Sequence, residues 1–383
     1  MKKYFIIAAA AIVALAACTK TEADKTAYEQ SRVINFNTVT GKATKAPITG
    51  TAYLSTYSNF GVFAWYLAEG NWNTAAANSS AVAYMGTGSP LGTPVEVAFD
   101  DDLDIWAPTS TYYWPLEGTL TFIAYSPYNA GTATFSNAGV FKLTGFTVNT
   151  TVANQVDLLY SAIAANKNQN ESYYVDSTNS QNSETAEGDK GVNIQFKHAL
   201  SQIVFKAKTA DSVYDSGMSF KIDTIVVNAA TTADSMTVTN PATDALPAAG
   251  TTWENPKTNG NFSVLVDADF PAAANTYLTK TLSAEIGDPL LMIPLANFTG
   301  THPTITVKYT LYRISDNQSL GSKEVTVYVE DKADVIGNWQ AGKKYEYDLT
   351  IDLQKIYFTP AILDWDDDNV PQQGVDVPND ARS

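Results

Sequence analysis

Few residues in this chain could carry out acid–base or metal chemistry, and His198 is the first to consider. It lies between two runs that alternate like β-strands, in the stretch from Gly191 to Lys208. An imidazole acts as a general base beside a nucleophile, and as a metal ligand beside further histidines, cysteines or carboxylates. The flanking sequence supplies none of these, and His302 lies far along the chain in a Gly-Thr-His-Pro turn. We therefore predict a structural histidine, with a general base or a metal ligand as the alternatives.

Acidic side chains are numerous, but their spacing does not complete a calcium loop. Asp364, Asp366 and Asp368 have the spacing that opens such a loop, yet Asn369 stands where the turn needs glycine. The run from Asp100 to Asp104 fails in the same way, and the sequence contains no G-x-S-x-G nucleophile elbow. The sequence predicts no catalytic residue, no metal and no cofactor, and a protein that is not an enzyme. A hydrolase with paired carboxylates is the alternative that sequence alone leaves open.

Cys18 follows a segment with the pattern of an export signal. Lys2 and Lys3 precede an apolar run, Phe5–Ala14, that is too short to span a bilayer as a mature helix. The Leu-Ala-Ala-Cys that follows resembles a bacterial lipoprotein lipobox. The resemblance implies that residues 1–17 are a signal peptide and that Cys18 carries lipid, including palmitate, which holds the chain at the cell outer membrane. An ordinary signal peptide with a chance cysteine is the alternative.

Charge and cysteine content limit the partners and the means of stabilisation. The formal net charge is −16, and a chain this acidic repels phosphate backbones, so we expect no nucleic-acid partner. Membrane contact is expected from the lipid rather than from a basic face. Because Cys18 is the only cysteine, no disulfide can form within the chain, and burial of its 45% hydrophobic residues must stabilise the fold.

The elements that hold these residues are predicted to be strands. Apolar and polar residues alternate strictly over Thr304–Tyr312, Glu324–Glu330 and Tyr345–Leu353, which is typical of strands with one buried face. Earlier strands are predicted near residues 33–38, 60–66, 119–126 and 156–162, with turn-forming residues between them. One short helix is predicted between Asn154 and Ala164. The pattern favours an all-β protein made of antiparallel sandwiches.

Composition also suggests how the chain is divided. Residues 165–190 are the most polar internal stretch and cannot bury enough apolar surface to form an element. We therefore place a domain boundary there and predict two β-sandwich domains, over residues 48–190 and 191–370. Residues 18–47 would form a lipid-anchored tether followed by one strand, and residues 371–383 a polar tail.

His198 lies where the strand pattern changes phase. Phe196, His198 and Leu200 share one parity, whereas Ile203 and the residues after it continue on the other. A shift of one residue requires a bulge or a tight turn at about residues 199–202. We therefore expect these three residues on the core side, with the His198 ring bonding a backbone group left unpaired by the bulge.

Seven short stretches form an ordered series along the chain. Each is weak alone, but together they cover about residues 33 to 366. They are Phe60–Trp65, Tyr112–Pro115 with Leu120–Pro127, Val156–Tyr160, Phe196–Ser201, Leu291–Pro294, Trp339–Tyr347 and Leu363–Trp365. In this order they resemble the motifs of the fimbrillin family, the subunits of type V pili in Bacteroidota.

This resemblance implies transthyretin-like domains and a surface lipoprotein of the fimbrium that joins other fimbrial subunits by strand addition. A trypsin-like protease would remove an N-terminal strand, and a strand from a neighbouring subunit would fill the groove. The removable strand would contain Val33, Ile34, Asn35 and Phe36, of which Ile34 and Phe36 fill pockets. Processing would fall between Lys45 and Ala46. The alternative processing sites are Lys42 and Arg32.

The position of the chain within a fimbrium stays open between stalk, tip and anchor. The segment after Trp365 is polar and contains two prolines, so it makes a poor donor strand. An uncut chain would suit an anchor or accessory subunit. The alternative function is a glycan-binding outer-membrane lipoprotein, whose sugar-stacking side chains would come from five tryptophans: Trp65, Trp72, Trp106, Trp114 and Trp253.

Overall fold

The computed structural model describes stretches of the chain that are mostly β-strand. The described residues are 33–40, 59–72, 77–100, 105–168, 191–239, 251–295, 302–329, 339–353, 355–364 and 377–378. Their helical elements are short: α4 (Asp211–Asp215) and the 3-10 turns η1 (Ala77–Ser80) and η2 (Val152–Asn154). None of these described helices has the length and apolar character needed to cross a membrane. The predicted all-β class is confirmed.

A nine-stranded sheet dominates the first half of the chain, and seven of its strands form a closed ring. In sheet order the nine strands are β10 (Ala164–Lys167), β6 (Thr119–Ser126), β9 (Leu159–Ser161), β11 (Val192–His198), β1 (Phe36–Thr40), β5 (Ile105–Pro108), β4 (Val95–Asp100), β2 (Asn59–Leu67) and β3 (Val82–Met85). Because β2 also pairs with β6, the path β6-β9-β11-β1-β5-β4-β2 returns to its start. Strands β10 and β3 pair outside the ring, on β6 and β2.

Strands β2 and β6 are buried on both faces. Phe60, Val62 and Phe122 point into a core enclosed by the ring. Phe63 and Ile123, of opposite parity, belong to a second core that continues into the C-terminal half. Two buried faces explain why the sequence shows nearly continuous apolar runs here instead of strict alternation.

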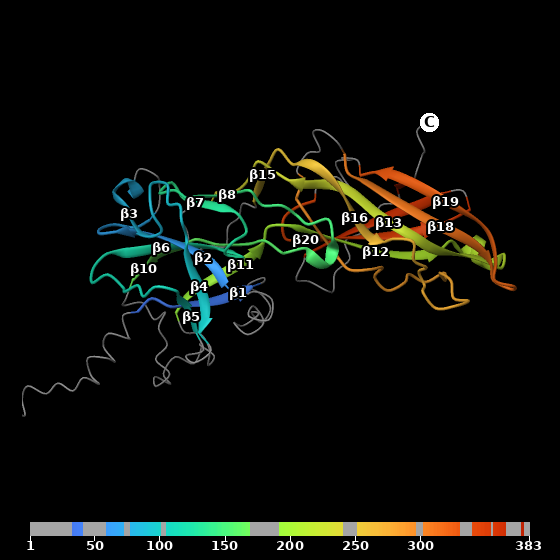
Figure 1. Cartoon of the computed structure of the whole chain (residues 1–383), viewed down its shortest axis with the longest axis horizontal. Coiled ribbons are helices and arrows are strands. Elements are labelled where there is room, and N and C mark those ends of the chain that lie inside the picture. Colours follow the sequence, from blue (N-terminus) through green and yellow to red (C-terminus); the bar gives the residue numbers. More distant parts are fainter. Residues whose placement is uncertain are drawn as a thin grey trace, which may run out of the picture.

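A small sheet joins the two halves of the chain. Strands β7 (Thr132–Phe135) and β8 (Val140–Thr144) come from the first half, and β14 (Ser235–Thr239) and β15 (Thr252–Glu254) come from the second. They form one four-stranded sheet, ordered β15-β14-β8-β7, which lies midway along the elongated molecule (Figure 1). We call it the junction sheet.

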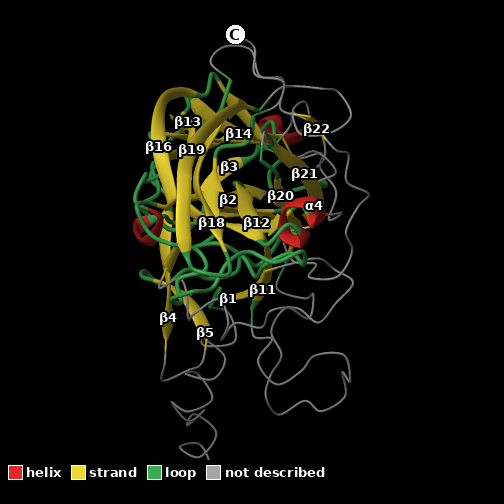
Figure 2. Ribbon diagram, turned by 90° about the vertical axis from the view of Figure 1, so that its right-hand side faces the viewer, coloured by secondary structure: helices red, strands yellow, loops and turns green. Residues whose placement is uncertain are grey.

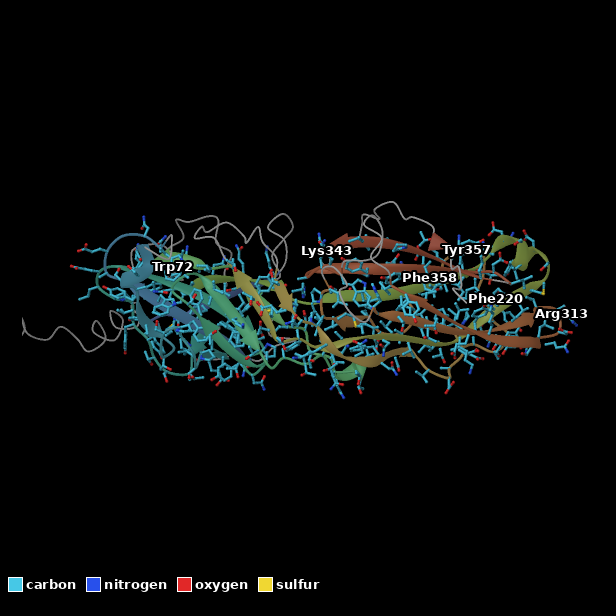
Figure 3. The ribbon with its side chains drawn as sticks, turned by 90° about the horizontal axis from the view of Figure 1, so that it is seen from above. Trp72, Phe220, Arg313, Lys343, Tyr357 and Phe358 are labelled. Carbon is cyan, nitrogen blue, oxygen red and sulfur yellow. The ribbon has the colours of Figure 1, made fainter. Side chains whose placement is uncertain are left out.

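The C-terminal half is a sandwich of two sheets, seen end-on in Figure 2. The five-stranded sheet is ordered β17 (Leu290–Met292), β12 (Ser201–Thr209), β20 (Lys343–Ile351), β21 (Ile356–Asp364) and β22 (Val377–Pro378). The four-stranded sheet is ordered β16 (Lys257–Leu265), β13 (Met218–Thr232), β18 (Thr304–Arg313) and β19 (Gln318–Tyr328). Trp72 and Arg313 lie toward opposite ends of the described part of the molecule (Figure 3).

Most strand pairs are antiparallel, but two are parallel and occupy similar places. β1 pairs in parallel with β11, and β12 pairs in parallel with β20. In each case the first described strand of one half of the chain lies beside a later strand of that half. The β1 pairing covers five residue pairs and the β12 pairing covers eight, so β1 is the less extensively paired of the two.

Several sequence expectations need correction. The helix predicted between residues 154 and 164 is replaced by β9 and the start of β10, after η2. Strand β11 pairs with β1 and β9, and the sheet changes only at residues 199–200, not at the boundary placed between 190 and 191. Part of the expected polar tail, Val377–Pro378, adds a short strand to β21.

Candidate functional site

Strand β1 closes the ring of the nine-stranded sheet, and the space that it fills is the candidate site. It runs parallel to β11, from the pair Phe36–Val192 to the pair Thr40–Phe196. On its other side Phe36 pairs with Trp106 of β5, and the Ile34 amide donates to the Tyr112 carbonyl at 2.8 Å. Without β1, the facing edges of β11 and β5 would be unpaired, which is the situation that strand addition satisfies. We call this space the β1 slot.

Two apolar side chains hold β1 in the slot. Ile34 is 0% exposed and Phe36 is 1% exposed. The Phe36 ring packs edge-on against Phe60 and Phe122, with ring centroids 6.0 and 5.6 Å away. Burial of side chains of this size is worth roughly 1.5–3 kcal/mol each, so these two account for much of the affinity of the strand.

The other residues of the predicted removable strand have different surroundings. Val33 is half-buried and forms an isolated bridge with Tyr113. Asn35 is 8% exposed, and its carbonyl accepts a hydrogen bond of 2.8 Å from the Val192 amide. Strand β1 itself extends two residues past the predicted end at 38, to Thr40.

Gly191 is a part of the slot that the sequence did not predict. It has a φ of +107°, and a Cβ at this position would lie 2.5 Å from the carbonyl carbon and oxygen of Asn35. The β1 backbone therefore passes directly over this residue, at a distance that only glycine permits. A glycine immediately before an alternating strand was the available signal, because it marks a turn or a close backbone approach.

The face of β11 that lines the slot is apolar, because Val192, Ile194 and Phe196 belong to the ring core together with Ile34 and Phe36. The other face of the sheet is also shielded from water. On β11, burial lowers the pKa of the Lys197 ammonium. Burial also raises the pKa of the Tyr160 hydroxyl, in the residue paired with Lys197, to about 12. Both shifts oppose the charged form, and they arise on the face of the sheet that is turned away from the slot, where Tyr160 belongs to the second core.

The segment that would be processed lies outside the described residues. Arg32, Lys42, Lys45 and Ala46 belong to it, as does Cys18. Strand β1 ends at Thr40, and the next described strand is β2. The two strands are not hydrogen-bonded to each other.

Comparison with known proteins gives the family. A family model described as Fimbrillin-like matches residues 44–365 of this chain. The chain belongs to the fimbrillin-like family. The match begins after β1, so the strand in the slot lies outside it.

Two relatives illustrate the likeness of this fimbrillin-like chain. It is 26% identical over 121 residues to the fimbrium subunit Fim1C of Phocaeicola vulgatus, which covers 31% of this chain and 29% of that protein. The solved structure of a fimbrial protein from Bacteroides vulgatus has 18% sequence identity and a TM-score of 0.54, and the alignment covers 87% of this chain and 99% of that one. The structural likeness supports the fold.

His198 of the fimbrillin-like chain lies beside a carboxylate that the sequence did not predict as its partner. Its Nδ1 lies 2.5 Å from Oδ2 of Asp157, and the two side chains are 17% and 14% exposed. This carboxylate lies 41 residues earlier in the sequence, so the residues next to His198 did not predict it. The expected bond to a backbone group of a bulge stays a prediction. Among the described residues, no group of three or more histidines, cysteines or acids is arranged to hold a metal.

The flanking core residues show what His198 connects. Phe196 is 1% exposed and belongs to the ring core, whereas Leu200 is 0% exposed and belongs to the second core. His198 lies between them, half-buried, where β11 ends and the chain passes into β12. With Asp157, it ties the end of β11 to the segment before β9.

Four of the five tryptophans proposed for the glycan-binding alternative are buried, and the fifth is partly buried. Four of them are 1–6% exposed: Trp65, Trp72, Trp106 and Trp114. Trp253 is half-buried, and its Nε1 donates to the Ala199 carbonyl at 3.0 Å. These side chains fill cores, so they cannot form the sugar-stacking platform that this alternative needs.

Proposed function

We propose that this protein is a structural subunit of a fimbrium, exposed at the cell surface, which joins a neighbouring subunit by exchange of the strand in the β1 slot. The observation that carries the proposal is the position of β1, which closes a ring of seven strands and seats Ile34 and Phe36 in its core. Membership of the fimbrillin-like family supports a structural rather than a catalytic role.

The closed ring gives a reason for delayed assembly. While β1 is in place, neither β11 nor β5 offers a free edge at this position, so a second subunit cannot add a strand. Cleavage between β1 and β2 would leave β1 held by non-covalent contacts alone. Its replacement by a strand from a neighbour would then create a head-to-tail contact that repeats along a filament.

The membrane anchor and the processing enzyme are parts of the same proposal. Lipid on Cys18 would hold the uncut chain at the outer membrane, and a trypsin-like protease cutting after Lys45 would separate the subunit from that anchor. An uncut chain would serve as an anchor or accessory subunit instead. The tail is a poor donor, because its only described strand is the residue pair Val377–Pro378, which already pairs with β21.

Limited trypsin digestion of the full chain, followed by N-terminal sequencing and gel electrophoresis, tests the proposal. We expect a new terminus at Ala46 and a ladder of oligomers after the cut. A Lys45→Gln variant should keep its N-terminal segment and stay monomeric, while Lys42→Gln serves as the matched control. A chain that is cut after residue 45 and neither forms oligomers nor accepts an added strand would contradict strand exchange.

A further inference from the structure

One position in the β1 slot fits its resident strand badly. Thr38 is 0% exposed, and its Oγ1 has no hydrogen-bond partner among the described residues. It lies on the same face of β1 as Ile34 and Phe36, opposite Ile194 in the parallel register with β11. A hydroxyl removed from water without a replacement partner opposes binding.

Thr38 is not the only residue whose buried hydroxyl has no partner among the described residues, since Thr119, Thr237, Thr251 and Tyr309 share this feature. Two fully buried hydroxyls on other strands do have partners. Ser161 Oγ accepts from the Ala124 amide at 2.8 Å and donates to the Ala162 carbonyl at 2.8 Å. Thr209, also 0% exposed, lies with its Oγ1 2.8 Å from Ser219 Oγ. What sets Thr38 apart is its place: it is 0% exposed and belongs to β1, so its unpaired hydroxyl weakens the fit of this strand in the slot.

We propose that the pocket around Thr38 determines which strand the slot prefers, and that it selects a strand with valine at this position over the resident one. Valine has the shape of threonine with a methyl group in place of the hydroxyl, so it fills the same space without the unpaired group. The preferred partner is an extended segment of another subunit with apolar residues at the three inward positions now held by Ile34, Phe36 and Thr38. This inference rests on the proposed strand exchange and specifies its partner.

The uncut full chain tests the pocket by itself. A Thr38→Val variant should slow hydrogen exchange of the β1 amides about tenfold, because one unpaired buried hydroxyl is removed. Thr209→Val is the matched control: it is equally buried but loses a partnered hydroxyl, so it should lower the midpoint of thermal unfolding. If the β1 amides of Thr38→Val exchange hydrogen at the same rate as in the parent protein, or faster, the inference is wrong.

The cut chain tests selection between strands. The chain is cleaved after residue 45, by trypsin or by a site-specific protease whose recognition sequence replaces residues 42–47. It is then incubated with synthetic peptides of residues 32–41, either unchanged or with Thr38→Val or Phe36→Ala. Native mass spectrometry should show that the Thr38→Val peptide occupies the slot at about one tenth of the concentration needed by the unchanged peptide. The Phe36→Ala peptide should compete poorly.

The two experiments separate the possible failures. If peptides exchange but the Thr38→Val peptide has no advantage, the inference is wrong and strand exchange stands. Suppose instead that Thr38→Val slows hydrogen exchange of the β1 amides in the uncut chain, but no peptide enters the slot of the cut chain. The proposed strand exchange is then wrong, and the proposed selection of partner strands is wrong with it.

Discussion

At the scale of single residues, Gly191 is the most sensitive position of the slot. Its φ of +107° already excludes most side chains, and its missing Cβ leaves space for the backbone of Asn35. Any other residue would have to push β1 outward, although it would touch none of the pocket-filling side chains directly. The position of β1 in the slot therefore depends on the backbone geometry at Gly191 as well as on the side chains of Ile34 and Phe36.

A Gly191→Ala variant should lose protection of β1 while keeping the rest of the fold. We expect faster hydrogen exchange at the β1 amides and a loss of stability above the roughly 1–2 kcal/mol that a positive φ alone brings to alanine. Gly145→Ala is the matched control, because Gly145 has a φ of +80° and a Cβ there would meet no atom within 4 Å. Equal effects of the two substitutions would show that the close approach to Asn35 is unimportant.

Asp348 is the residue that should make the stability of the sandwich depend on pH. Burial, and then the neighbouring Glu346 carboxylate, raise the pKa of Asp348 to about 6, against the opposing effect of Lys206 and Lys208. The folded state thus favours the protonated form. The stability that protonated Asp348 contributes is complete below its unfolded pKa, near 4, and is lost as the pH rises through 6.

An Asp348→Asn variant should remove this dependence. We expect its midpoint of thermal unfolding to exceed that of the parent at pH 7, with a difference that shrinks between about pH 6 and pH 4. The carboxylate is partly exposed, so solvent screening keeps the effect modest. Unfolding curves of both proteins at several pH values provide the check, and parallel pH profiles would contradict the role given to Asp348.

At the scale of elements, the positions of several strands were predictable from sequence, whereas their long-range contacts were not. The predicted strand at residues 119–126 matches β6, and those at 304–312 and 345–353 differ from β18 and β20 by two residues at most at each end. Alternation reports which face is buried, but it does not report the partner strand. The pairing of β14 with β8 and the reach of Asp157 to His198 depend on chain segments far apart in sequence.

Gln155 shows how a side chain can stand in for a strand. Its Oε1 accepts from the Leu291 amide at 2.7 Å, and its Nε2 donates to the Leu291 carbonyl at 3.1 Å. These are the two bonds that a neighbouring strand would make to β17. No pattern in the sequence marks this contact, because it spans 136 residues.

Replacement of Gln155 should loosen β17. Gln155→Ala leaves both groups of Leu291 without this partner, whereas Gln155→Glu keeps an acceptor for the amide and loses the donor. We expect the Leu291 amide to exchange fastest in the alanine variant and at an intermediate rate in the glutamate variant. Equal exchange in all three proteins would mean that this contact does not hold the strand.

At the scale of the whole molecule, the junction sheet makes the two halves unfold together. Met236 and Val238 of β14 are 1% and 0% exposed and lie in the core that continues through both halves. Because β14 pairs with β8 of the other half, opening either half exposes apolar surface of the other. A single cooperative transition is therefore expected for the parent protein.

A Val238→Asp variant should separate that transition into two. A carboxylate at this buried position would disrupt the pairing of β14 with β8, while the two halves keep most of their own strands. Thr239→Asp, at the exposed end of the same strand, is the matched control and should leave one transition. Differential scanning calorimetry distinguishes the outcomes, and a single transition in Val238→Asp would refute the coupling.

The parallel register of β1 with β11 also bears on how a joint between two subunits would respond to force. When β1 is pulled along its own length, the force acts on all five residue pairs at once, so their hydrogen bonds must break together. Pulled sideways, the same strand would unzip one pair at a time and yield at a lower force. Such a joint would be strong in tension and weak to peeling, and single-molecule pulling in two attachment geometries would measure the difference.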